Sequence, residues 1–398
     1  MSASCPVCNL TLPLSEIQSH ANAHFESDED GVQDFCDEQL ALQLASSDPS
    51  PSSATFDDSM DLDGKVACLV SSQTKSTFYR VRQDGLICLL KNCLESELRS
   101  KPKPQEGAAC LLSGYVDHFQ CNPSEDLGWG CGWRNIQMQC SHLLSHREEV
   151  RPLLFGASGF VPDIPSLQLW LEMAWSKGFD LAGSLHFGNR IYGSKKWIGT
   201  TECAALLRSF GLKARIVDFA PKKSESLHLS VPGSALAGKR KPCGPMDRYV
   251  IMKQESHPEN SVKRCGSNPS RISREETLMD WVWNYFSDNS WNMSSGVRLT
   301  SKSPLYFQHD GHSRTIIGIQ KCWRGLSHQY NLLILDPADR TEALETSLVE
   351  KKGWEKYFKR GAHTLKQPEY QLLYVDDGIA NGEELEQLKI IDSLFVEF

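Results

Sequence analysis

The sequence predicts an α+β fold, preceded by a small finger-like module and a flexible helical arm. Helical and strand-like periodicities follow one another from about residue 107 to the C-terminus, which indicates one mixed unit. Two cysteines and two histidines lie within the first 25 residues, in a spacing typical of small metal-stabilised modules. Between these parts lies a stretch rich in serine, proline and aspartate, which is the composition of a linker.

The composition bounds the class of protein. The chain has 398 residues, of which 40% are hydrophobic, so it can bury a sizeable core. Its net charge of −8 argues against extensive binding of nucleic-acid phosphates. We expect no signal peptide and no membrane span, because no apolar run has the necessary length. The 14 cysteines are scattered, so we expect reduced thiols inside the cell.

The first module, residues 1–25, carries Cys5-x-x-Cys8 followed by His20-x-x-x-His24. Two thiolates on a tight turn and two imidazoles one helical turn apart complete a tetrahedron around Zn²⁺, so we expect a structural zinc here. No lysine or arginine precedes the last of these histidines, which is unfavourable for DNA binding. Protein recognition is the better expectation, and the module resembles small ubiquitin-binding zinc fingers.

The arm follows in two parts. Residues 26–63 begin with acidic side chains, and the periodicity of residues 37–45 predicts a short helix. This helix resembles part of a ubiquitin-interacting helix, but the serine expected four residues after Ala41 is absent, and an ordinary amphipathic helix is the alternative. The rest of this part is predicted to be a disordered linker. Residues 64–106 form a helical arm whose amphipathic run, residues 86–98, packs on the main domain or binds ubiquitin.

The main domain is predicted to span residues 107–398. The periodicity predicts helices over residues 166–175, 200–210 and 275–285, and a strand over residues 214–219. A threonine is available to cap the second of these helices. Residues 221–274 are polar and broken by Gly and Pro, so we expect a flexible surface insertion with one strand, over residues 248–252. Its basic run, residues 239–242, is either a nuclear-import signal or a solvated loop.

Cys131 lies between two glycines in the segment Gly-Trp-Gly-Cys-Gly-Trp-Arg-Asn. The glycines predict a sharp turn and the close approach of another backbone. An apolar helical face follows, formed by Trp133, Ile136, Cys140, Leu143 and Leu144. Cys131 is therefore expected at the N-terminus of a buried helix, where the dipole and free N–H groups stabilise a nucleophilic thiolate. The alternative is an ordinary buried core cysteine.

A histidine and a carboxylate are predicted to meet near this thiol. His312 precedes one buried strand, and Asp336 ends the next, after a turn near Arg324. If the strands pair as a hairpin, His312 and Asp336 lie opposite each other at its open end. The carboxylate would hold the imidazole in one tautomer, so that it can take the proton of Cys131. A structural hydrogen bond without chemistry is the alternative.

Three separated motifs point to a family. They are the segment around Cys131, the run Trp-Ile-Gly-Thr-Thr-Glu, and Gly-His-Ser-Arg-Thr around His312. In these motifs, over roughly residues 107–398, the chain resembles the UFM-specific-peptidase family of papain-like cysteine proteases; UFM is a ubiquitin-fold modifier. The resemblance implies a papain-like fold, with Cys131 as nucleophile, His312 as general base and Asp336 as orienting acid. It also implies Gln308 as a donor to the oxyanion, beside the Cys131 backbone N–H.

The chain departs from the family pattern in two places. In UFM-specific members the acid lies two residues before the histidine, so Asp310 competes with Asp336 for this role. We favour Asp336, because cross-strand neighbours face each other whereas alternate residues of one strand do not. The N-terminal finger makes the chain similar to the zinc-finger ubiquitin peptidases of the family, which prefer lysine-63-linked chains. Other members of that group can carry several fingers, and this chain has one.

This resemblance also implies how the substrate is read. Asp180 and Glu202 would bind the arginines of the ubiquitin tail, Arg-Leu-Arg-Gly-Gly, and Trp197 would wall its glycine slot. The UFM tail ends in Val-Gly and lacks these arginines. The implied protein is a monomer of cytoplasm and nucleus that binds ubiquitin and polyubiquitin, contacts no nucleic acid or membrane, and needs no cofactor for catalysis. The alternatives are a UFM-specific protease, an inert ubiquitin-binding adaptor, and solvated acids around a core tryptophan.

Overall fold

The computed structural model describes residues 2–4, 11–13, 60–81, 85–100, 106–221, 274–287, 296–309, 311–324 and 327–397. Several predictions therefore lie outside the described residues: the zinc ligands Cys5, Cys8, His20 and His24, the helix over residues 37–45, Asp310, and the interior of the insertion. The strands β1 (Ser2–Ser4) and β2 (Thr11–Pro13) pair antiparallel on either side of the two cysteines in the sequence. Among the described helices, none has the length and apolar character to cross a membrane.

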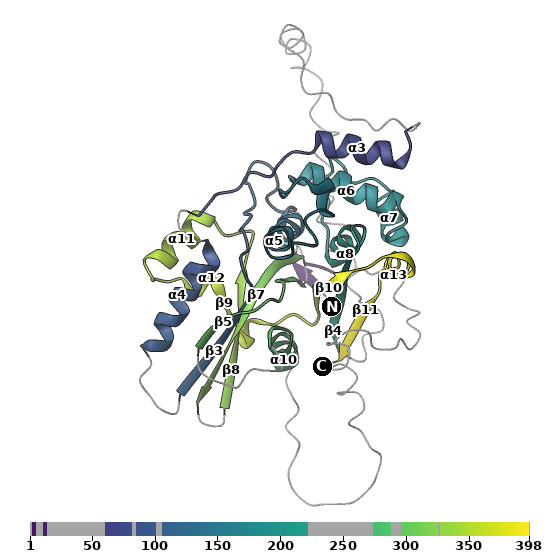
Figure 1. The fold of residues 1–398 in the computed structure, drawn as a ribbon. Helices are drawn as coiled ribbons and strands as arrows, with labels where there is room; N and C mark the ends of the chain where they lie inside the picture. The colour runs from purple at the N-terminus through teal and green to yellow at the C-terminus, as the bar shows by residue number, and fades with distance from the viewer. Residues whose placement is uncertain are drawn as a thin grey trace, which may run out of the picture.

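A mixed sheet organises the main domain (Figure 1). Its nine described strands are β3 (Glu106–Leu112), β4 (Leu212–Ala220), β5 (Gly296–Leu299), β6 (Leu305–His309), β7 (His312–Arg324), β8 (Ser327–Leu335), β9 (Lys359–Gly361), β10 (Tyr370–Ile379) and β11 (Ser393–Glu397). The main path runs β11-β4-β10-β6-β7-β3-β5, and β8 pairs with both β7 and β9. The long strand β7 therefore meets β6 and β3 along one edge and β8 along the other.

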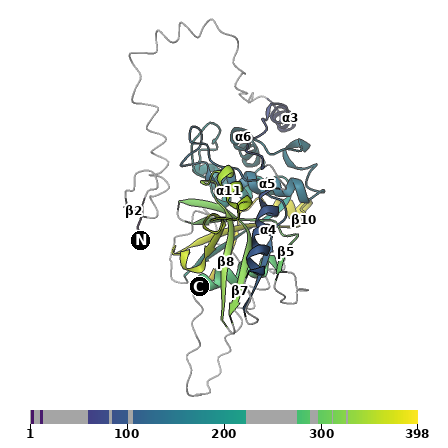
Figure 2. The same cartoon turned by 90° about the vertical axis from the view of Figure 1, so that its left-hand side faces the viewer.

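Helices cover both faces of this sheet. They are α3 (Leu62–Ser72), α4 (Leu86–Arg99), α5 (Cys131–His146), α6 (Ile164–Ser176), α7 (Leu181–His186), α8 (Thr200–Arg208), α10 (Arg274–Phe286), α11 (Thr341–Val349), α12 (Glu355–Phe358) and α13 (Gly382–Gln387). One core lies under α5, α6 and α8, and a second lies under α10 on the opposite face. Figure 2 shows α4 and α11 side by side, where they pack against each other.

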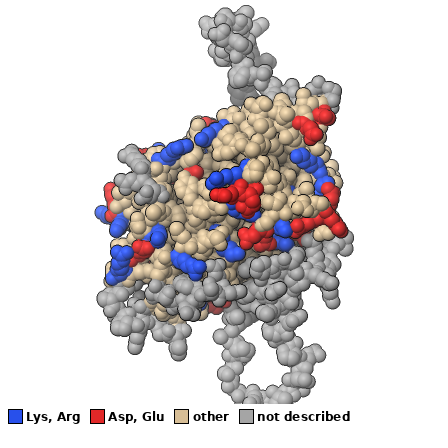
Figure 3. Space-filling view, in the orientation of Figure 1, with Lys and Arg blue, Asp and Glu red and all other residues tan. Residues whose placement is uncertain are grey.

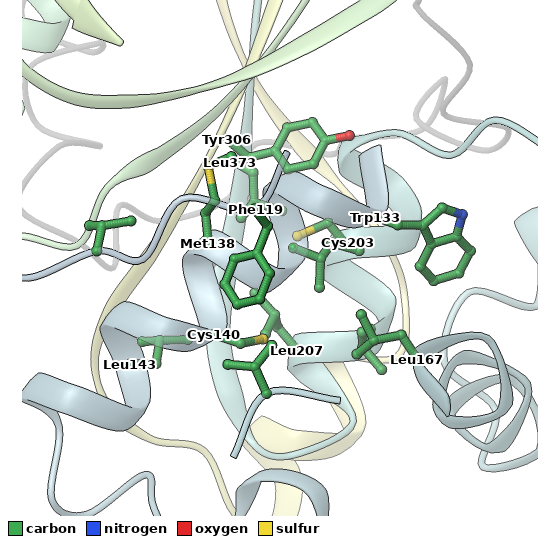
Figure 4. Close-up of a cluster of buried hydrophobic side chains, with 14 of the residues drawn as sticks. Phe119, Trp133, Met138, Cys140, Leu143, Leu167, Cys203, Leu207, Tyr306 and Leu373 are labelled. Atoms are coloured by element: carbon green, nitrogen blue, oxygen red, sulfur yellow. The ribbon is translucent and has the colours of Figure 1, made fainter. Parts of the chain in front are cut away.

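The helix that begins at Cys131 is anchored by its apolar face. Trp133, Cys140 and Leu143 are fully buried. Figure 4 shows them in one cluster with Cys203 and Leu207, which α8 contributes. Burying such side chains stabilises the fold by roughly 1.5–3 kcal/mol each. The helix is therefore held rigidly along its length, and its first residue inherits that rigidity.

The predicted elements of the main domain are largely confirmed, as is the α+β class. Helices α5, α6, α8 and α10, the strand β4 and the β7–β8 hairpin lie where the periodicity placed them. One prediction was wrong: no threonine caps α8. Gly199 is its N-cap residue, and the backbone N–H of Gly199 is bound by the side chain of Glu202 at 2.7 Å. The acid three residues inside the helix thus does the capping.

Candidate active site

Glycine is required on both sides of Cys131. A Cβ atom built on Gly130 would lie 2.0 Å from Oδ2 of Asp126, and one on Gly132 would lie 2.7 Å from the carbonyl oxygen of Ile198. Gly128, with φ of 91°, makes the turn that enters this segment. The close backbone approach predicted from the sequence therefore occurs, at Gly132. Cys131 itself is partly exposed at the first turn of α5.

A buried ion pair braces this loop. The Nε and Nη2 atoms of Arg134 donate to the two carboxylate oxygens of Asp126, at 2.9 and 3.0 Å. The backbone N–H of Gly130 donates to the carbonyl of Asp126 at 2.8 Å. Both charged side chains are almost fully buried. The loop before Cys131 is thereby tied to the second turn of the same helix, which fixes the position of the thiol.

His312 and Asp336 meet at the open end of the hairpin. Nε2 of His312 lies 3.0 Å from Oδ1 and 3.2 Å from Oδ2 of Asp336. His312 also hydrogen-bonds with the thiol of Cys131. Because Nε2 faces the carboxylate, Nδ1 is the nitrogen left for the sulfur. The structure thus brings Cys131, His312 and Asp336 into one chain of contacts, from α5 through β7 to the end of β8.

The electrostatics of this chain favour a thiolate–imidazolium pair. Burial raises the pKa of Cys131, but the hydrogen bond and charge of His312 outweigh burial and leave this pKa below its usual value. Burial lowers the pKa of His312, but its hydrogen bonds with Asp336 and Cys131 reverse this and raise the pKa to about 9. Burial also opposes ionisation of Asp336, yet the contacts of His312 hold its pKa well below the usual range.

The turn that carries Asp336 is held by a segment that the sequence prediction did not single out. Buried His118 contacts the backbone oxygen of Asp336 through Nε2 at 2.9 Å and the hydroxyl of Thr341 through Nδ1 at 2.8 Å. The backbone N–H of Cys121 donates to the carbonyl of Pro337 at 2.7 Å. These contacts fix the backbone from which the carboxylate projects.

Polar links between α5 and β7 were also missed. Nδ2 of Asn135 donates to the Cys131 carbonyl at 2.7 Å and to Oγ of Ser313 at 2.9 Å. Thr315 donates to Oδ1 of the same asparagine at 2.8 Å. Buried Tyr306 also hydrogen-bonds with Ser313. Asn135 lies one helical turn after Cys131, and this spacing is the signal that could have identified it.

Gln308 lies in β6, opposite Ser313 of β7. Its Oε1 accepts a hydrogen bond from the backbone N–H of Thr200 at 3.1 Å. A Cβ atom on Gly199 would lie 2.5 Å from this oxygen, so the amide packs closely on the start of α8. This contact holds the amide of Gln308 in one orientation at the start of α8.

The two predicted tail-binding acids are buried rather than solvated. Asp180 caps α7 through Oδ1, which accepts from the backbone N–H of Gly183 at 3.0 Å, while Oδ2 is buried without a hydrogen-bond partner in the described structure. Glu202 binds the N–H of Gly199 through Oε2. Burial, with a smaller repulsion from Asp180, raises the pKa of Glu202 to about 7. Both carboxylates therefore pay a desolvation cost that a bound cation would relieve.

Trp197 lies beside the reacting groups. Its indole Nε1 donates to the carbonyl of Gly128 at 2.6 Å, in the loop that precedes Cys131. A Cβ atom on Gly311, next to His312, would lie 3.2 Å from the indole ring. The tryptophan is 7% exposed and thus forms a wall between the two halves of the site. Among the described residues, no group of three or more His, Cys, Asp or Glu side chains could hold a metal ion.

Comparison with known proteins places these residues in context. The model of Peptidase family C78 matches residues 105–373. The chain is 33% identical over 276 residues to human zinc finger-containing ubiquitin peptidase 1. This match spans 69% of the present chain and 38% of the human protein. It is 26% identical over 309 residues to the ubiquitin carboxyl-terminal hydrolase mug105 of Schizosaccharomyces pombe. This match spans 78% of the present chain and 100% of the yeast protein.

A shorter match concerns the other modifier. Mouse Ufm1-specific protease 1 is 35% identical to this chain over 105 residues, which are 25% of this chain and 38% of that protease. The chain therefore spans less than half of the length of the human ubiquitin peptidase that it matches, namely 38%.

Proposed function

Because the chain belongs to peptidase family C78, we propose that it is a thiol peptidase that hydrolyses isopeptide bonds between ubiquitin units. The contact chain Cys131–His312–Asp336 carries this proposal. A thiol, a base and an orienting acid in mutual contact are the groups that acyl transfer requires. The helix that begins at Cys131, the sheet that carries the base and the indole of Trp197 between them also support a papain-like arrangement.

The reaction proceeds in two halves. The Cys131 thiolate attacks the carbonyl carbon of the ubiquitin C-terminal glycine, and the oxyanion accepts hydrogen bonds from the Cys131 backbone N–H and the NH₂ group of Gln308. His312 then gives its proton to the departing lysine amine, which leaves a thioester. In the second half His312 takes a proton from water, and the resulting hydroxyl group displaces Cys131. Asp336 holds the imidazole in orientation throughout.

Substrate choice is assigned to three residues: Asp180, Glu202 and Trp197. Asp180 has a buried carboxylate oxygen without a hydrogen-bond partner among the described residues, and Glu202 is a second buried acid close enough to repel it. Each acid already accepts one backbone N–H, and guanidinium groups of the ubiquitin tail would add charged donors to both. The indole of Trp197 lies between Gly128 and Gly311 and would exclude all but glycine from the last two tail positions.

The finer assignments follow from the resemblance. Lysine-63-linked chains are the proposed preference, and the finger with Cys5, Cys8, His20 and His24 is proposed to bind zinc and a ubiquitin unit. UFM is the second candidate modifier, favoured by the partial match to a Ufm1-specific protease.

The test is cleavage of lysine-63- and lysine-48-linked diubiquitin and of a UFM-conjugated lysine peptide, by the parent and by Cys131→Ala. We expect faster cleavage of the lysine-63 linkage, no cleavage by the variant, and retained binding of diubiquitin by the variant. Cleavage of the UFM conjugate alone would transfer the function to that modifier. Binding without cleavage by the parent would identify an adaptor.

A further inference from the structure

Arg314, which is not one of the three residues Cys131, His312 and Asp336, also contacts the carboxylate of Asp336. Its Nε atom donates to Oδ2 of Asp336 at 2.6 Å, which is shorter than either contact from His312. On its other side, Nη1 of Arg314 lies 2.6 Å from Nε2 of His309. The side chain of Arg314 is 22% exposed and that of Asp336 is 8% exposed, so this pair is shielded from bulk water.

The two carboxylate oxygens of Asp336 have different partners. Oδ1 lies 3.0 Å from Nε2 of His312 and accepts a hydrogen bond from the backbone N–H of Ala338 at 3.0 Å. Oδ2 receives His312 at 3.2 Å and Arg314. Without Arg314, the longer His312 contact would be the one hydrogen bond left to Oδ2 among the described residues. The guanidinium therefore prevents the carboxylate from rotating about its terminal bond.

The charge of Arg314 has a second consequence. A guanidinium is permanently positive, and it competes with the imidazolium of His312 for the same carboxylate. A like charge nearby disfavours the protonated imidazole, so it makes His312 a better donor to a departing amine. Other charged groups in electrostatic reach of this cluster are Cys131, Asp339 and Arg360, and His309 lies on the opposite side of Arg314.

We propose that Arg314 is a positioning residue for Asp336, and that its charge limits how strongly Asp336 holds the proton on His312. The inference rests on the proposed thiol-peptidase chemistry but not on ubiquitin as the substrate. It goes beyond the family assignment, because Arg314 would act through Asp336 and not on the substrate.

The test compares Arg314→Gln, which removes the charge, with Arg314→Lys, which keeps the charge but loses the planar fork. Arg215→Gln is the matched control, because Arg215 also donates from Nε to an aspartate Oδ2 at 2.6 Å, and its side chain is 19% exposed. The rate of Cys131 alkylation by iodoacetamide is measured as a function of pH, by mass spectrometry of the peptide that contains Cys131. This rate reports the ionisation of the thiolate–imidazolium pair and needs no protein substrate. Cleavage of a ubiquitin amide gives kcat in parallel.

The upper midpoint of the alkylation–pH profile is the pH at which His312 loses its proton. In Arg314→Gln, we expect this midpoint to rise by about one pH unit, as loss of a nearby unit charge predicts. In Arg314→Lys, we expect the parent midpoint with kcat reduced by about tenfold. Arg215→Gln should match the parent in both. An unshifted midpoint in Arg314→Gln, or an equal shift in Arg215→Gln, overturns the inference. If Arg314→Gln fails to fold, parent kcat in Arg314→Lys overturns it.

The outcomes separate the two claims. If the parent cleaves no ubiquitin amide, the proposed function fails, while the alkylation profile still decides the role of Arg314. If cleavage proceeds and the midpoints do not differ, the proposed function stands and the inference about Arg314 fails.

Discussion

Asp336 meets His312 because one residue of β7 has no partner in β8. The cross-strand pairs run Gly318↔Leu333 and then Ile316↔Ile334, so Ile317 is a bulge. If this register continues, Asp336 lies across from Arg314 of β7. His312 precedes Arg314 by two residues in the same strand, so both side chains point to the same face of the sheet as Asp336. Without the bulge, Asp336 would lie across from Thr315 and point to the other face of the sheet.

The first prediction concerns the identity of the acid. Asp336→Asn should reduce kcat more than Asp310→Asn, because the amide cannot balance the charge of the His312 imidazolium. The loss of a triad aspartate reaches about 10⁴-fold in a serine protease, and we expect a smaller loss here because thiols are more acidic than hydroxyl groups. Steady-state cleavage of a ubiquitin amide measures both variants. Equal losses, or a larger loss in Asp310→Asn, would move the role to Asp310.

The same variant has a pH signature. Burial lowers the pKa of His312, and the hydrogen bond that His312 donates to Asp336 is the largest influence that raises it again, to about 9. The upper limb of the parent activity profile should therefore lie near pH 9. In Asp336→Asn, it should move to lower pH, because the imidazolium loses its carboxylate partner.

A second prediction uses Glu202. Burial raises its pKa to about 7, so the side chain is largely neutral at pH 6 and largely ionised at pH 8. A guanidinium binds the ionised form, and KM for a ubiquitin substrate should therefore fall as pH rises across 7. Glu202→Gln should abolish this dependence and raise KM at pH 8 at least tenfold, since truncating a desolvated charge pair costs roughly 2–5 kcal/mol. A pH-dependent KM that persists in Glu202→Gln would exclude this carboxylate as the arginine ligand.

A third prediction concerns the brace behind the nucleophile. Arg134→Met leaves Asp126 buried without its counter-ion, which typically costs about 3–5 kcal/mol of unfolding free energy. Arg99→Ala is the control, because Arg99 is 79% exposed and its pair with Glu95 is a surface pair. We expect the control to change stability by less than about 1 kcal/mol. Urea denaturation measures both, and similar midpoints would refute the brace.

Local patterns were sufficient to predict one half of the site from the sequence. The glycines around Cys131 and the apolar spacing after it predicted the helix start, and two apolar runs around a short turn predicted the hairpin. These are near-neighbour signals, so periodicity reports them directly. The order of the sheet is not local: β10 lies between β4 and β6, although it follows both in the sequence.

The features that tune the site were not visible in the sequence. A bulge at Ile317 leaves no mark in an apolar run, and the contact of Arg314 with Asp336 depends on it. Capping preferences rank threonine well and so predict a threonine N-cap for α8, whereas the buried side chain of Glu202 makes the capping contact instead.

A fourth prediction concerns the finger, whose ligands were assigned from their spacing alone. The 398-residue chain, purified without chelator, should contain one zinc per chain by elemental analysis, and the double variant Cys5→Ser, Cys8→Ser should contain none. Cys88→Ser is the control and should retain the metal. Equal zinc content in the double variant and the control would remove these cysteines from the proposed site.

The central claim, that Cys131 is a nucleophile directed at ubiquitin, is tested most directly by covalent labelling. Ubiquitin and UFM, each bearing a C-terminal electrophile, are incubated with the parent, with Cys131→Ala and with Cys121→Ala, and adducts are located by mass spectrometry. We predict a ubiquitin adduct at Cys131 in the parent and in Cys121→Ala, little UFM adduct, and no adduct in Cys131→Ala. Preferential labelling by UFM, or a ubiquitin adduct that persists in Cys131→Ala, would contradict the account.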